Sequence, residues 1–177
     1  NAGARPGDRI YITKPIGNGI IATAIKAEMV SPQAYDEAIY WMTMLNKESS
    51  EIAAEMGVNA ATDVTGFGLL GHLAEMAQAS RVTVQLHAGA VPLISGAWDG
   101  ASMGLIPGGT YNNRTYLEER ISVDPGLNPI WLDLLYTPET AGGLLLAVSA
   151  GQASILEEAM QKRQIFCALI GKAVEAC

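Results

Sequence analysis

The stretch from Ala61 to Leu73 reads ATDVTGFGLLGHL and is the most informative part of the chain. A short strand pattern over residues 59–64 runs into three glycines between positions 66 and 71, and a helical pattern follows through residue 79. Glycines at a strand-to-helix turn let a ligand approach the backbone, and the first amides of a helix have no partner within it. Because these amides lie at the positive end of the helix dipole, the turn is predicted to suit phosphate.

Asp63 stands at the end of the predicted strand, directly before this turn. A carboxylate beside a phosphate group is repelled by it unless a cation lies between them. Mg²⁺ is commonly held by one or two carboxylates together with phosphate oxygens. The local chemistry therefore predicts a nucleotide phosphate, a Mg²⁺ ion and Asp63 as a ligand of that ion.

Two other interpretations of the turn stay open at this point. The spacing Gly66-x-Gly68-x-x-Gly71 fits the dinucleotide-binding fingerprint, which is a weak signal when it stands alone. That fingerprint needs an apolar strand before it and an acidic residue about 20 positions later, whereas residues 81–96 contain no Asp or Glu. The other alternative is an ordinary helix start whose glycines serve close packing without any ligand.

Composition limits the classes of protein. Of the 177 residues, 49% are hydrophobic and only 16% are charged, so we expect another domain or subunit to cover part of the surface. The net charge of −7 argues against a surface for nucleic acid or for an anionic membrane. No apolar run is long enough to span a membrane, no signal peptide is visible, and Cys167 and Cys177 form no metal motif. We therefore expect a cytoplasmic protein.

The rest of the chain predicts a lead-in or linker remnant over residues 1–8 and a single domain over residues 9–177. Strands are expected over residues 9–13, 59–64, 81–87, 144–148 and 165–174, and helices over residues 18–28, 32–56, 92–103 and 151–164 in addition to the central one. The polar insert at 46–50 is a candidate bend or break in the long second helix. Residues 107–109 are expected to form a turn.

Four further polar residues are candidates for binding an anion or a metal. Lys14 could point at an anion, but a solvated lysine is the favoured interpretation. Arg114 could hold a phosphate through two hydrogen bonds, although an ion pair with Glu118 four residues later is favoured. Neither His72 nor His87 has a second ligand at metal spacing, so both are expected to be structural or exposed.

Five segments resemble signature segments of the selenophosphate synthetases, also called selenide, water dikinases. In chain order they are TKPIG (13–17), LNK (45–47), TDVTGFGLLGH (62–72), IPGGTYNNR (106–114) and PETAGGLL (138–145). The family usually has Ser where Ala141 stands and often Thr where Asn18 stands. The resemblance covers the family's C-terminal domain. Its N-terminal domain, which has the reactive Cys or selenocysteine, a catalytic Lys and most metal-binding Asp residues, is not in this sequence.

The resemblance implies an α+β fold, a mixed β-sheet packed with helices as in the C-terminal domains of aminoimidazole ribonucleotide synthetase-like proteins. It implies a parent enzyme that converts ATP, selenide and water to selenophosphate, AMP and phosphate with Mg²⁺. Asp63 would be the metal ligand from this domain, and Gly66 and Gly68 would lie near the polyphosphate. No residue of the chain would be catalytic, so the fragment alone would be inactive.

The implied partners are the protein's own N-terminal domain and a second full-length copy in a homodimer. Two alternatives stay open. One is another ATP-dependent enzyme of the same superfamily, such as a purine-pathway cyclase, against which the segments 107–114 and 138–145 argue. The other is a non-catalytic interaction module that has the same fold.

Overall fold

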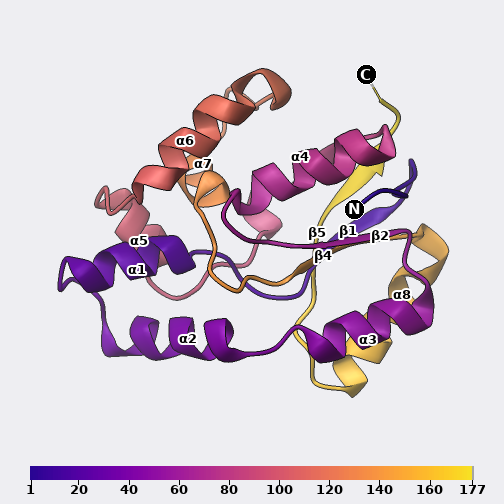
Figure 1. The fold of residues 1–177 in the computed structure, drawn as a ribbon, viewed down its shortest axis with the longest axis horizontal. Coiled ribbons are helices and arrows are strands. Elements are labelled where there is room, and N and C mark those ends of the chain that lie inside the picture. The colour runs from indigo at the N-terminus through magenta and orange to yellow at the C-terminus, as the bar shows by residue number, and fades with distance from the viewer. Residues whose placement is uncertain (177) are drawn as a thin grey trace.

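A five-stranded sheet forms the centre of the computed structural model, which describes residues 1–176 (Figure 1). The strands are β1 (Arg9–Ile12), β2 (Ala60–Asp63), β3 (Thr83–Leu86), β4 (Leu144–Val148) and β5 (Ala168–Val174). The helices are α1 (Asn18–Lys26), α2 (Pro32–Thr43), α3 (Lys47–Met56), α4 (Gly68–Ser80), α5 (Ala97–Ser102), α6 (Gly108–Leu117), α7 (Pro129–Tyr136) and α8 (Ala153–Lys162), with three short 3₁₀ turns, η1 (Ala88–Ala90), η2 (Glu118–Arg120) and η3 (Ala150–Gln152).

The strand order is β2-β4-β1-β5-β3, and all four ladders that join these strands are antiparallel. The α+β class is therefore confirmed, but the sheet is antiparallel where a mixed one was expected. Within residues 1–176, parallel pairing is limited to an isolated bridge between Ile16 and Leu93. Strands that follow one another in sequence are not neighbours in the sheet.

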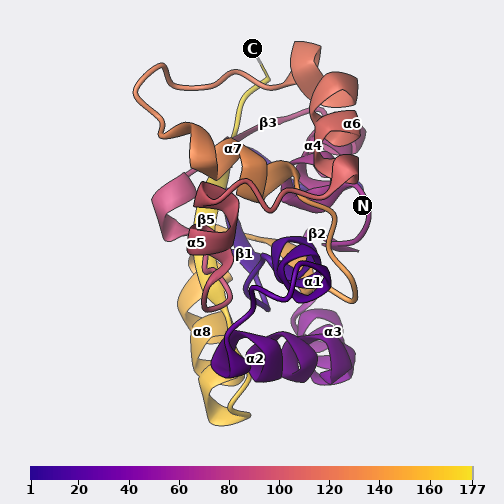
Figure 2. The ribbon, with the colours of Figure 1, turned by 90° about the vertical axis from the view of Figure 1, so that its left-hand side faces the viewer.

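Helices cover both faces of the sheet. Alternate side chains of a strand point to opposite faces, and apolar side chains occur on both faces here. Ile10 and Ile12 of β1 pack with α4 on one face, whereas Tyr11 packs with α3 and α8 on the other. Figure 1 shows α4 on one side of the sheet and α3 and α8 on the opposite side. Helices α1, α2, α5 and α7 share a further apolar cluster, and Figure 2 faces the side of the molecule where they lie.

The predicted long second helix is two helices, α2 and α3, separated at residues 44–46. The break lies at the start of the polar insert and is held by polar contacts: the Asn46 side chain donates to the carbonyl oxygen of Gly142 at 2.8 Å. The predicted turn at 107–109 is instead the start of α6. Gly, Thr and Asn are poor helix formers, but Thr110, Asn113 and Leu117 are spaced by three and four residues and are all buried, so packing forms this helix.

Residues 1–8, expected as a lead-in, lie against the domain. The Ser80 hydroxyl accepts hydrogen bonds from the amides of Gly3 and Ala4, each at 3.1 Å. Asp8 is buried, and its carboxylate accepts from the Asn59 side chain at 2.9 Å. None of the described helices is both long enough and apolar enough to cross a membrane.

Candidate functional site

Asp63 is the last residue of β2, which is an edge strand, and its side chain is exposed. It borders a shallow depression between β2 and α3, together with Asn46, Thr62 and Leu144. Within residues 1–176, no cation lies within ion-pairing distance of Asp63. That same part of the chain has no cluster of three His, Cys, Asp or Glu residues able to hold a metal. Asp63 is thus an exposed carboxylate without a cation partner among the described residues.

The glycines after Asp63 differ in what surrounds them. A Cβ atom at Gly66 would have no atom within 4 Å, whereas one at Gly68 would lie 2.7 Å from the carbonyl oxygen of Thr137 and 2.8 Å from that of Tyr136. Gly68 also has a φ of +70°, which side chains disfavour. Close packing therefore explains the glycine at position 68, which agrees with the interpretation that glycines of this turn serve packing without a ligand. At Gly66 the space on the side where a Cβ atom would lie, called the outer side of the turn below, is open.

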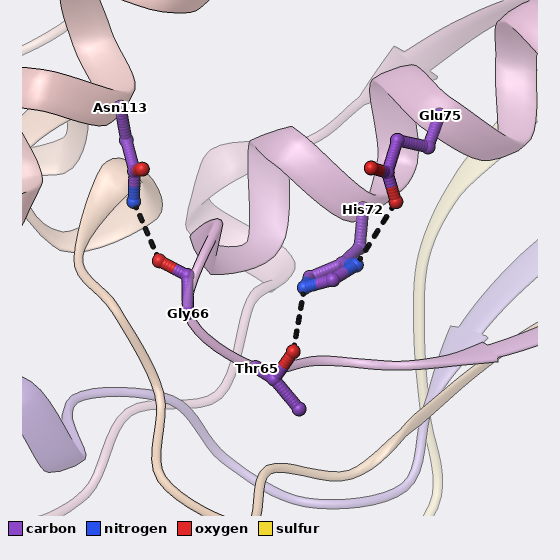
Figure 3. Close-up of polar contacts among 5 residues, drawn as sticks. All are labelled: Thr65, Gly66, His72, Glu75 and Asn113. Atoms are coloured by element: carbon purple, nitrogen blue, oxygen red, sulfur yellow. Dashed lines mark hydrogen bonds and ion pairs between the residues drawn. The ribbon is translucent and has the colours of Figure 1, made fainter.

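Side chains fix the inner side of this turn, as Figure 3 shows. The Asn113 carboxamide donates to the carbonyl oxygens of Gly66 at 2.9 Å and Tyr136 at 3.0 Å. The Thr65 hydroxyl lies 3.0 Å from Nε2 of His72, and Nδ1 of His72 lies 3.3 Å from a Glu75 carboxylate oxygen. The turn is thus held to α6, α7 and α4 at the same time.

The second polar turn, residues 137–143, lies beside the first. The amide of Glu139 donates to the carbonyl oxygen of Thr65 at 3.0 Å, and the amide of Val64 donates to that of Gly143 at 2.9 Å. The Glu139 side chain is buried, and its two carboxylate oxygens accept from the amides of Gly17 at 2.7 Å and Asn18 at 3.0 Å. The Glu139 carboxyl group therefore accepts from the amides at the start of α1.

Burial raises the pKa of Glu139 to about 8, although the hydrogen bonds from the Gly17 and Asn18 amides lower it in part. Both oxygens of this carboxyl group accept from amides within the protein. Glu139 is accordingly a structural residue of the site's surroundings, and sequence reasoning assigned it no role. Its signal was the placement of an acidic residue three positions before a paired glycine and an apolar strand.

Lys14 is buried rather than solvated, so the favoured prediction for it was wrong. Its ammonium group donates to the carbonyl oxygens of Trp41 at 3.1 Å, Met44 at 2.6 Å and Ala141 at 2.9 Å. Two of these acceptors lie at the end of α2, where the helix dipole favours a cation. Burial lowers the pKa of Lys14. The Lys14 side chain thus links the end of α2, next to the α2–α3 break, to the turn at residues 137–143.

His72 is buried and holds the turn through Thr65, and His87 is exposed, in line with the expectation that both are structural or exposed. Arg114 forms no ion pair with Glu118 within the described chain, contrary to the favoured prediction. Cys167 is a free, partly buried thiol, and the expectation for Cys177 lies outside the described residues.

The sequence matches the family described as "AIR synthase related protein, C-terminal domain" over residues 5–177. The chain belongs to this family. Among curated relatives, this AIR synthase-related domain is 48% identical over 170 residues to "Selenide, water dikinase" of Caldanaerobacter subterraneus subsp. tengcongensis, a match that covers 96% of the chain and 49% of the relative. It is 43% identical over 171 residues to the protein of the same name from Trichlorobacter lovleyi, covering 97% of the chain and 49% of the relative.

The AIR synthase-related domain thus spans about half the length of these relatives, and the resemblance seen in the five sequence segments is confirmed. Solved structures confirm the fold. Thiamine-monophosphate kinase from Stenotrophomonas maltophilia K279a has a TM-score of 0.71 at 16% identity, covering 99% of this chain and 50% of that one. Hydrogenase maturation protein HypE in complex with ATP has a TM-score of 0.61 at 22% identity, covering 97% and 44%.

Proposed function

We propose that this domain is the C-terminal half of a selenide, water dikinase, which converts ATP, selenide and water to selenophosphate, AMP and phosphate. Identities of 48% and 43% over nearly the whole chain to relatives of that name support the assignment. The observation that carries the site is the free, exposed carboxylate of Asp63 at the end of β2, beside a turn whose Gly66 is open on its outer side.

Asp63 serves as a Mg²⁺ ligand in this proposal, and Gly66 leaves room for the polyphosphate beside it. Gly68 contributes by bringing the turn close to residues 136–137 rather than by touching phosphate. A bound Mg²⁺ would neutralise charge on the phosphate oxygens, which is the main demand of phosphoryl transfer. Since Mg²⁺ takes few protein carboxylates, one from this domain is a reasonable share of its ligands.

No residue of this chain is assigned a catalytic role. By resemblance to the family, the reactive Cys or selenocysteine, a catalytic Lys and the remaining metal-binding Asp residues lie in the N-terminal domain. Asp63 therefore completes a site to which two domains contribute.

The N-terminal domain and a second full-length copy are the proposed partners, in the cytoplasm. Large apolar side chains are exposed along α2 and next to both its ends, which supports a covered surface there: Met29, Tyr35, Ile39, Tyr40 and Leu45. The low charged fraction of 16% agrees with such a covered surface.

The test is selenide-dependent AMP formation by the full-length protein at saturating Mg²⁺. We expect Asp63→Asn to lower kcat/KM about a hundredfold, because the isosteric amide removes one negative charge from the metal's ligand shell. The matched control Asp99→Asn, an exposed aspartate on α5, should leave the rate unchanged. The 177-residue chain alone should form no AMP.

Near-normal turnover of full-length Asp63→Asn would remove this residue from the metal site. Absence of selenide-dependent AMP formation by the unmodified full-length protein would remove the proposed reaction itself. Selenide-dependent activity of the 177-residue chain would contradict the assignment of all catalytic residues to the other domain.

A further inference from the structure

We propose that Asn113 is a positioning residue of the nucleotide site: its carboxamide holds the turn at residues 65–68 so that Asp63 and the open side of Gly66 face the Mg²⁺–polyphosphate. This proposal rests on the proposed function. Asn113 itself touches no ligand in it, because the side chain is buried under the turn.

The position of Asn113 follows from the packing of α6. Thr110, Asn113 and Leu117 form the buried stripe of this helix, which places the Asn113 side chain against the end of α7 and the central turn. Its amide nitrogen has two hydrogens, and it donates to two carbonyl oxygens, those of Gly66 and Tyr136. Figure 3 shows the side chain reaching from α6 to the Gly66 carbonyl.

The carbonyl groups at this contact need a donor between the two segments. At Gly68 the turn comes so close to the end of α7 that a Cβ atom would lie 2.8 Å from the Tyr136 carbonyl oxygen. The Asn113 carboxamide bridges the same end of α7 and the Gly66 carbonyl, so one side chain satisfies both acceptors and fixes their separation. Removing it would leave two carbonyl groups without this donor.

The turn is fixed on its inner side and free on its outer side. On the inner side, the amide of Glu139 donates to the carbonyl oxygen of Thr65, and His72 contacts the Thr65 hydroxyl. On the outer side, Gly66 has open space, and the Phe67 side chain is 48% exposed. Because Asp63 stands three residues before Gly66, a shift of the turn also moves the carboxylate, and misplacements of about 1 Å can cost a hundredfold in rate.

The experiment measures the KM for Mg²⁺ and kcat of the full-length protein at saturating ATP and selenide. We expect Asn113→Ala to raise the KM for Mg²⁺ about tenfold or more, while kcat at saturating Mg²⁺ falls about threefold or less. Asn112→Ala changes the adjacent exposed residue of α6 in the same way and should change neither value.

A second control separates positioning from stability. Thr110→Val removes the buried contact between the Thr110 and Thr137 hydroxyls, which are 3.0 Å apart, and leaves both hydrogen bonds of Asn113 in place. It should lower the melting temperature without changing the KM for Mg²⁺. Should Asn113→Ala fail to fold, Asn113→Gln keeps both donors on a side chain one carbon longer, displaces the turn and should raise the KM for Mg²⁺ in the same way.

An unchanged KM for Mg²⁺ in folded Asn113→Ala, or in Asn113→Gln where alanine fails to fold, would overturn the proposal. An equal rise in Thr110→Val would overturn it too, since loosening of α6 would then explain the effect. These outcomes require an active unmodified protein, whereas failure of the proposed function appears as absence of selenide-dependent AMP formation before any substitution is made.

Discussion

Two segments with an acidic residue lie side by side at the neighbouring ends of β2 and β4, and their carboxyl groups have opposite surroundings. Asp63 is the last residue of β2 and is exposed, whereas Glu139 precedes β4 and is 5% exposed. The two segments are joined by the hydrogen bonds from the Glu139 amide to Thr65 and from the Val64 amide to Gly143. Glu139 uses both its carboxylate oxygens on amides of α1, while Asp63 has no cation partner among residues 1–176.

The comparison shows that Glu139 contacts amides inside the protein, whereas Asp63 is exposed to solvent. A buried carboxylate is tolerated only when donors within the protein satisfy it. An exposed carboxylate beside a rigid turn keeps its binding capacity for a cation. Substitution at Glu139 should therefore affect stability, and substitution at Asp63 should affect binding.

The largest stability effect is expected for Glu139→Ala in this chain. Loss of the carboxyl oxygens leaves the buried amides of Gly17 and Asn18 without acceptors, which should lower the free energy of unfolding by about 2–4 kcal/mol. Urea denaturation followed by circular dichroism measures this. Glu158→Ala on the exposed side of α8 is the control and should stay within about 0.5 kcal/mol. Equal losses in both variants would mean that Glu139 does not support α1.

The second prediction concerns pH. Burial raises the pKa of Glu139 from 4.5 to about 8, so the folded protein retains a proton that the unfolded chain loses. The stabilisation is fully present below about pH 4.5 and is lost as pH rises through about 8. Each pKa unit corresponds to about 1.4 kcal/mol, so the decline attributable to this group should amount to a few kcal/mol.

Glu139→Gln cannot titrate and should remove this decline. Denaturation curves at pH 5, 7 and 9 for the unmodified chain and for Glu139→Gln test it. A difference between the two proteins that stays constant from pH 5 to pH 9 would show that Glu139 has an ordinary pKa.

The smallest stability effect is expected for Asp63→Asn in this chain. The exposed side chain has no cation partner in the described part of the protein, so the free energy of unfolding should change by about 0.5 kcal/mol or less. Thermal unfolding checks this. A large fall in melting temperature would make Asp63 a structural residue of the turn and would remove the contrast with Glu139.

Much of this fold could be predicted because local patterns decide it. β4 was predicted at residues 144–148, and β2 and α4 were placed within a residue or two, since an apolar run and a glycine turn mark them. Helix α6 was missed because its residues are poor helix formers and only packing of Thr110, Asn113 and Leu117 stabilises it. The antiparallel pairing also depends on long-range contacts that no local pattern records.

Asp63 and the turn that follows it have a local signature, so the exposure of this residue could be predicted from the sequence. Its role as a Mg²⁺ ligand stays a prediction. The roles of Lys14 and Glu139 depend on partners more than 25 residues away in the sequence, such as Trp41 for Lys14 and Gly17 for Glu139. Solvation was therefore the natural expectation for Lys14, and only its burial among three carbonyl groups shows otherwise.

The most direct test of the account is a crystal structure of the full-length protein with Mg²⁺ and a non-hydrolysable ATP analogue. We predict a Mg²⁺ ion about 2.1 Å from a carboxylate oxygen of Asp63, with the polyphosphate beside Gly66. Glu139 should remain on the amides of Gly17 and Asn18. A metal site completed without Asp63, or one in which Glu139 leaves α1 to bind the ion, would contradict the account.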